Sequence, residues 1–95
     1  EWIHYAASKG ALDSFTIGLT REVGAQGIRV NSIRPGMIDT ELQAQGTPGR
    51  LEKSLATIPM QRAGTADEVA EAIVWLMSDA ASYVHGAFLD VSGGR

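Results

Sequence analysis

Tyr5 and Lys9 are the first residues in the sequence whose types and spacing could do chemistry. They stand four residues apart in a segment with helical patterning, which places both side chains on one helix face and within reach of each other. An ammonium group beside a phenol favours the phenolate form, so the pair could act as a general acid in one direction and a general base in the other. A surface pair at the start of a helix is the alternative interpretation.

Other polar side chains are weaker candidates. Ser8 has no histidine or acid at a spacing that would make it a nucleophile. His4 and His85 are too few and too separated for the ligand sets that metal sites need, so we expect no metal. Arg62 is expected to form a structural ion pair rather than a substrate contact.

Composition excludes several classes of protein. The chain has 95 residues, a net charge of −3, 44% hydrophobic residues and no cysteine. This suits one small folded domain and excludes disulfides and thiolate sites. No basic patch and no apolar run of the roughly 20 residues needed for a membrane span is present. We therefore expect no nucleic-acid or membrane partner and a cytoplasmic location. Because the sequence opens in mid-pattern, without methionine or a signal sequence, we expect it to be part of a longer domain.

The elements that must position Tyr5 and Lys9 follow from periodicity and turn residues. The expected order is helix, strand, lid-like excursion, helix, strand, over residues 5–23, 28–33, 37–60, 65–79 and 87–91. One short helix is expected on either side of Thr47-Pro48-Gly49 within the excursion. Thr65 and Glu68 form a capping box. Two strands joined by a long connection predict a right-handed parallel crossover.

Each helix is expected to bury one apolar face. On the first helix this face is a bulky stripe, and a second face of small residues would let another backbone approach closely. On the later helix the buried face carries larger aliphatic residues. The three sets are Leu12, Phe15, Leu19 and Val23; Ala7, Ala11, Ser14 and Gly18; and Val69, Ile73, Leu76 and Met77.

Several motifs together resemble the short-chain dehydrogenase/reductase family in order and spacing. They are Tyr5-Ala6-Ala7-Ser8-Lys9-Gly10-Ala11-Leu12, Ile28-Arg29-Val30-Asn31, Pro35-Gly36-Met37-Ile38-Asp39-Thr40, Ala81-Ser82-Tyr83-Val84 and Gly93-Gly94. The resemblance covers nearly the whole chain and is to the C-terminal part of sugar-alcohol, glucose and 3-oxoacyl reductase types. It implies an α/β fold, the C-terminal portion of a Rossmann-like doubly wound parallel sheet. Residues 1–95 would belong to a single NAD(P)-binding domain, with residues 37–60 as the substrate lid.

The resemblance also implies roles for individual residues. Tyr5 matches the catalytic tyrosine, and Lys9 matches the lysine that binds the ribose hydroxyls and favours the phenolate. Pro35 and Gly36 match the turn beside the nicotinamide ring. Ile38 matches a position whose backbone meets the carboxamide, and Thr40 matches a hydroxyl near the cofactor phosphates. Glycine permits a close backbone approach, and strand ends are where such sheets bind ligands.

Two functions from different classes are open at this point. The first, implied by the resemblance, is an enzyme that transfers hydride between NAD or NADP and a carbonyl/alcohol substrate, as a homodimer or homotetramer. The second is a catalytically inactive packing or dimerisation module. The family's glycine-rich phosphate loop and its catalytic serine would lie upstream of these residues. Ser92 and His85 depart from the aspartate and threonine that are common in relatives.

Overall fold

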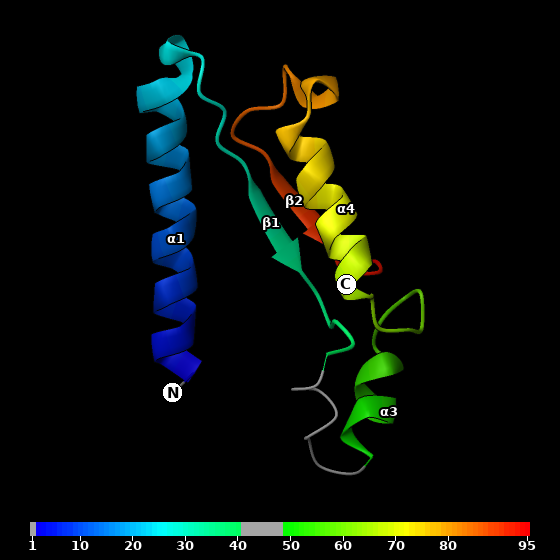
Figure 1. Ribbon diagram of the computed structural model, residues 1–95. Helices are drawn as coiled ribbons and strands as arrows, with labels where there is room; N and C mark the ends of the chain where they lie inside the picture. The colour runs from blue at the N-terminus through cyan, green and yellow to red at the C-terminus, as the bar shows by residue number, and fades with distance from the viewer. Residues whose placement is uncertain (1, 41–48) are drawn as a thin grey trace.

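The computed structural model describes residues 2–40 and 49–95 of the chain. Figure 1 shows two long helices flanking a pair of strands. The elements are α1 (Trp2–Val23), the 3-10 turn η1 (Gly24–Gln26), β1 (Ser32–Pro35), α3 (Arg50–Leu55), α4 (Ala66–Met77), the 3-10 turn η2 (Asp79–Ala81) and β2 (Phe88–Val91). This order matches the one expected from the sequence, and α3 is the short helix predicted after Gly49. The helix predicted before Thr47 lies largely outside the described residues.

β1 and β2 form a parallel pair, as the crossover argument predicted. The register joins Ser32 to Phe88 and Arg34 to Asp90. α4 lies in the connection between the strands and covers one side of the pair, while α1 lies on the other side (Figure 1). The chain therefore has the layered helix–sheet–helix arrangement of a parallel α/β fold.

The first strand begins four residues later than predicted, at Ser32 rather than Ile28. In the preceding segment, polar side chains supplement a single backbone bond, from the N–H of Gly86 to the carbonyl of Val30 at 2.7 Å. The Asn31 amide donates to the carbonyl of Val84 at 2.9 Å and accepts from the backbone N–H of Ala87 at 2.9 Å. The Arg29 guanidinium donates to the carbonyls of Val84 and Ser78, both at 3.2 Å. These long-range bonds satisfy backbone groups that a strand neighbour would otherwise pair.

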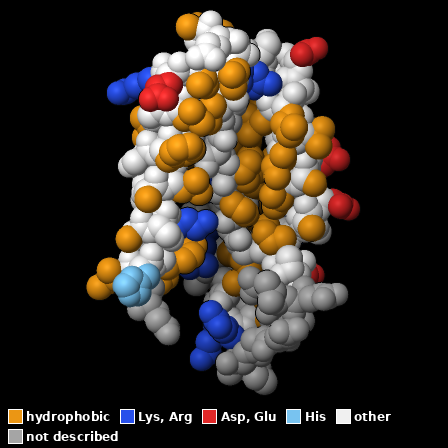
Figure 2. Space-filling view, turned by 60° about the vertical axis from the view of Figure 1, so that its left-hand side comes forward, with side chains coloured by type: hydrophobic (Ala, Val, Ile, Leu, Met, Phe, Trp, Pro, Cys, Tyr) orange, Lys and Arg blue, Asp and Glu red, His pale blue; other side chains and the backbone are white. Residues whose placement is uncertain are grey.

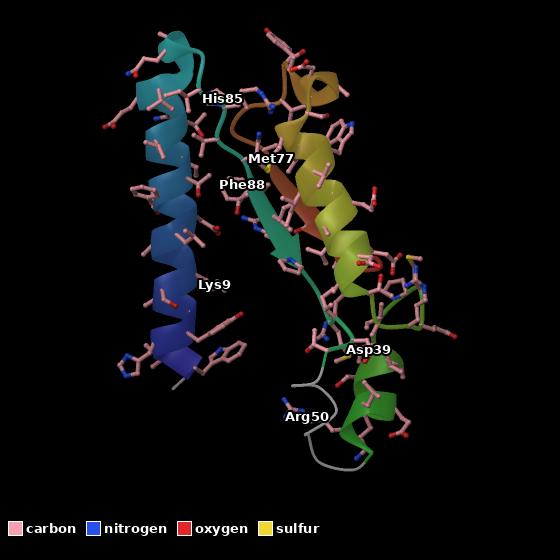
Figure 3. The ribbon with its side chains drawn as sticks, viewed as in Figure 1. Lys9, Asp39, Arg50, Met77, His85 and Phe88 are labelled. Atoms are coloured by element: carbon pink, nitrogen blue, oxygen red, sulfur yellow. The ribbon has the colours of Figure 1, made fainter. Side chains whose placement is uncertain are left out.

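His85 fixes the same end of the sheet to α1. Its Nδ1 accepts from the backbone N–H of Val30 at 3.1 Å, and its Nε2 lies 2.7 Å from the carbonyl of Thr20. The bridging ring is visible between α1 and the segment that leads into β1 (Figure 3). The adjacent Gly86 has φ +78°, and a Cβ there would meet Thr20 Cγ2 at 2.9 Å. A larger residue would push α1 away from this turn.

The buried face of α1 includes only part of the bulky stripe that the sequence predicted. Leu12 and Phe15 are exposed, at 51% and 64%. Thr16 is buried instead, and its hydroxyl donates to the carbonyl of Leu12 at 2.9 Å. Asp13 and Thr20 are half-buried on the same side. The face of α1 turned toward the strands is therefore partly polar, although Leu19 and Val23 of the predicted stripe are half-buried. The prediction for Leu12 and Phe15 was wrong because it assumed that the whole apolar stripe meets the sheet.

The small-residue stripe and the face of α4 give a similar picture. Ala7, Ala11, Ser14 and Gly18 are exposed. On α4, Leu76 is buried as predicted, but Ile73 and Met77 are exposed at 41% and 78%. Hydrophobic side chains gather in long bands on the face shown in Figure 2. These faces have no neighbour within the described residues to cover them.

The connection between β1 and α4 is held at both ends. The capping box of α4 is present as predicted, with the Thr65 side chain accepting from the N–H of Glu68. Ile58 is 2% exposed. A Cβ on Gly93, which has φ +69°, would meet Ile58 Cγ2 at 2.9 Å, and the N–H of Met60 donates to the carbonyl of Gly93 at 3.0 Å. The last part of the 37–60 segment is thus packed against the end of β2.

Candidate functional site

The sequence-predicted catalytic pair lies in the first turns of α1. Lys9 Nζ is 5.7 Å from the centre of the Tyr5 ring, so helical spacing does bring the two side chains together. Tyr5 is 55% exposed, and the Trp2 ring stacks beside it with centroids 5.8 Å apart. Ser8 belongs to the helix, where its hydroxyl donates to the carbonyl of Tyr5. The Lys9 ammonium and the Tyr5 phenol are therefore exposed, and a ligand can reach both groups.

The turn after β1 brings two backbone segments into close contact. The N–H of Gly36 donates to the carbonyl of Val91 at 2.9 Å, which extends the sheet pairing beyond Pro35. A Cβ on Gly36 would lie 2.8 Å from both Cα and Cβ of Ser92. Glycine is therefore required at this position by a neighbour within the chain itself, because backbone atoms on the opposing strand cannot swing aside.

Ile38 and Thr40 lie on the segment that leaves the sheet. Ile38 forms an isolated parallel bridge with Gly64. The N–H of Asp39 donates to the carbonyl of Gly64 at 2.8 Å, and the N–H of Gly64 donates to the carbonyl of Met37 at 2.9 Å. Thr40 is exposed. This pairing fixes the backbone of residues 37–39, where the sequence predicts a contact with a cofactor amide.

The two groups of predicted site residues lie at one end of the molecule. α1 runs antiparallel to β1, so its first turns and the carboxyl end of β1 point the same way (Figure 1). Lys9 and Asp39 lie toward this shared end in Figure 3. No hydrogen bond or ion pair joins Tyr5 or Lys9 to residues 35–40 in the described part of the chain. The first turns of α1 and the segment after β1 thus form two separate sides of the candidate site. Ligands of parallel α/β sheets bind beyond the carboxyl ends of the strands.

One ion pair that was not predicted connects α1 to β1. Arg34 Nη2 donates to Asp13 Oδ2 at 3.2 Å, which joins β1 to α1. The same guanidinium lies over the Phe88 ring, with Cζ 4.3 Å from its centre. Phe88 points from the strand pair toward α1 (Figure 3). The available signal was a charged residue, Arg34, immediately before Pro35 at the end of the strand.

Arg62 forms the structural ion pair that the sequence predicted. It donates to both carboxylate oxygens of Glu68, at 2.7 and 2.8 Å. Hydrogen bonds from Arg62 and from the backbone of Thr65 lower the pKa of Glu68 to about 2. Both residues line a hollow of about 460 Å³ with Met37 and the end of β2. Their mutual pairing gives this hollow a fixed polar wall.

Residues 2–40 and 49–95 contain no group of three or more histidine, aspartate or glutamate side chains that could hold a metal ion. None of the helices in this part of the chain is both long enough and apolar enough to cross a membrane.

Comparison with known proteins gives the family. The family model described as enoyl-(acyl carrier protein) reductase matches residues 1–95. The chain is 60% identical over its whole length to the uncharacterized oxidoreductase YgfF of Escherichia coli, covering 39% of that protein. It is 44% identical to the 3-oxoacyl-[acyl-carrier-protein] reductase FabG of Pseudomonas aeruginosa, over 96% of this chain and 37% of that protein.

A solved structure agrees with these sequence relatives. The crystal structure of 3-oxoacyl-[acyl-carrier protein] reductase from Brucella melitensis matches with a TM-score of 0.91 and 42% identity, over 96% of this chain and 34% of that chain. The chain thus spans less than two fifths of the length of the relatives it matches. Its two parallel strands and flanking helices are part of a Rossmann-like α/β fold. The chain belongs to the short-chain dehydrogenase/reductase family, whose relatives named here are oxidoreductases.

Proposed function

We propose that the protein containing this chain transfers hydride between a nicotinamide cofactor and a carbonyl/alcohol substrate. One observation supports this proposal above the others. The Tyr5–Lys9 pair lies toward the same end of the molecule as the carboxyl end of β1, where Pro35 and Gly36 are located. Tyr5 would pass a proton to the substrate oxygen during reduction and accept it during oxidation. Lys9 would favour the phenolate form by its positive charge.

The residues present fit the nicotinamide end of a dinucleotide. The Lys9 ammonium can donate to ribose hydroxyls, and the Gly36 turn presents backbone without a side chain. The fixed backbone around Ile38 can pair with a carboxamide, and the exposed Thr40 hydroxyl can bind a phosphate. The cofactor, NAD or NADP, supplies or accepts the hydride. The protein's own task is to orient the reactants and to hold the proton at the Tyr5 oxygen.

The proposed substrate class comes from the names of the relatives. Two of the relatives above are named as 3-oxoacyl-[acyl-carrier-protein] reductases, so a 3-oxoacyl thioester is the proposed substrate.

We further propose that residues 37–60 form the substrate lid. The described parts near its two ends support this proposal, because Ile38 pairs with Gly64 and Ile58 is buried.

The test is substitution of Tyr5 in the complete protein. Tyr5→Phe removes the proton donor while keeping the ring beside Trp2 and Lys9. Reduction of an acetoacetyl thioester should slow by about a hundredfold or more. Tyr83→Phe is the matched control, because Tyr83 is fully exposed and far along the chain from the pair. Turnover by Tyr5→Phe at the rate of Tyr83→Phe would refute the role.

A packing or dimerisation module is the second candidate. The exposed apolar side chains of α1, among them Leu12 and Phe15, favour a surface that another protein layer covers. The partner would be a second copy, in a homodimer or homotetramer, and the place of action would be the cytoplasm, which the cysteine-free sequence suits. Tight binding of NADH or NADPH by the 95-residue chain alone would contradict a purely structural module.

A further inference from the structure

Asp13 stands where it can compete for Lys9. It follows Lys9 by four residues on α1, which is the spacing at which a lysine and a carboxylate on a helix surface meet. Tyr5 precedes Lys9 by the same interval. Lys9 therefore has a phenol on one side and a carboxylate on the other. Its ammonium lies 5.7 Å from the centre of the Tyr5 ring.

Arg34 holds the competing carboxylate. Its guanidinium donates to Asp13 Oδ2 at 3.2 Å, and it is itself held over the Phe88 ring at 4.3 Å. A planar guanidinium resting on an aromatic ring loses little freedom when it pairs. Asp13 thus has a fixed partner from β1, whereas Lys9 would have to leave Tyr5 to reach it.

We propose that Arg34 is a positioning residue for the acid–base pair: by occupying Asp13, it leaves the Lys9 ammonium beside Tyr5. This inference rests on the proposed function. Arg34 touches neither Tyr5 nor Lys9 and acts through Asp13 alone. Without Arg34, Asp13 draws Lys9 toward itself, and the phenolate form of Tyr5 loses its neighbouring positive charge.

Other charged groups surround this face and enter the argument. Asp90 is the register partner of Arg34 on β2, so it offers a second carboxylate to Arg34 when Asp13 is removed. The other titratable or charged groups on the elements around Tyr5 are His4, Arg21 and Glu22 on α1, Asp39 after β1, and Arg50, Glu52 and Lys53 on α3. None of these precedes or follows Lys9 by four residues, so none has the helical spacing that Asp13 has.

The experiment is a rescue measured by pH dependence in the complete protein. Arg34→Gln should raise the pH at which alcohol oxidation reaches half its maximal rate by at most about half a pH unit, the limit in water for complete withdrawal of a unit charge about 6 Å away. Arg34→Gln combined with Asp13→Asn should return this pH to the wild-type value, since no carboxylate is left to draw Lys9. Arg34→Lys, which keeps the cation but not the guanidinium stacked on Phe88, should lie between the wild type and Arg34→Gln.

A second measurement needs no substrate. The midpoint pH of the tyrosinate absorbance in the ultraviolet, with Tyr5→Phe as the reference, should shift by the same number of pH units as the midpoint of the activity profile. Arg34→Met keeps an apolar stem against Phe88 and carries the same expectation if Arg34→Gln fails to fold. A wild-type profile in Arg34→Gln, or a double variant shifted as far as the single one, would overturn the inference. Full turnover in Tyr5→Phe would instead overturn the proposed function itself.

Discussion

Replacing Gly36 with alanine separates a structural role of this glycine from a role in binding. The added Cβ would lie 2.8 Å from Ser92 Cα, 2.8 Å from Ser92 Cβ and 3.3 Å from Ser92 O. Two of these three atoms belong to backbone, so the strand ends must separate, and the N–H···O bond from Gly36 to Val91, now 2.9 Å, lengthens. Overpacking of this kind costs about 1–3 kcal/mol, so Gly36→Ala should lower the free energy of unfolding by that amount.

Urea denaturation of the complete protein, followed by circular dichroism, measures this cost. Gly10→Ala is the control: its Cβ meets nothing within 4 Å in the described chain, and alanine in a helix interior gains about 0.5–1 kcal/mol over glycine. An unchanged unfolding midpoint for Gly36→Ala would refute the packing argument. Unchanged stability together with weaker NAD(P)H binding would show that the glycine serves the cofactor and not Ser92.

Three further outcomes follow from contacts elsewhere in the fold. Thr65→Ala should cost about 1 kcal/mol through loss of the α4 cap, and Thr65→Ser should retain it, both measured by urea titration. The pKa of Glu68 is lowered from 4.5 to about 2, so its contribution to stability is complete above pH 4.5 and is lost as the pH falls toward 2. Unfolding midpoints measured across this range should fall less steeply in Glu68→Gln; equal slopes would contradict the pairing with Arg62. Asn31→Ala breaks two bonds of 2.9 Å and should cost about 1–3 kcal/mol in the same denaturation assay, whereas a neutral result would mean that water replaces the amide.

Local features of the fold were predictable from the sequence because their causes are local. The capping box needs Thr65 and Glu68 three residues apart, and it formed as predicted. The helical spacing of Tyr5 and Lys9 likewise fixed their shared face. The parallel pairing followed from the length of the connection between the two strands.

Features that depend on distant residues were not predictable in this way. The start of β1 moved to Ser32 because Asn31 binds a turn 53–56 residues further along the chain. The Arg34–Asp13 pair spans 21 residues and joins two elements whose relative placement no periodicity specifies. For Gly36 the sequence predicted a close approach, but the neighbour within the chain is Ser92.

The orientation of α1 shows which requirement dominates in this helix. Turning α1 by half a revolution would bring Leu12 and Phe15 against the strands, and burying two such side chains fully is worth about 1.5–3 kcal/mol each. It would also break the Asp13–Arg34 bond and carry Tyr5 and Lys9 away from the end of β1. An exposed ion pair contributes no more than about 1 kcal/mol, so the bond to Arg34 alone cannot hold the polar face inward. The contact of His85 with the carbonyl of Thr20 also holds α1 in this orientation, which leaves Leu12 and Phe15 exposed in the described chain and favours a further surface that covers them. We expect a second apolar layer outside α1 to support this orientation, so variants that weaken that layer should reduce turnover without touching Tyr5 or Lys9.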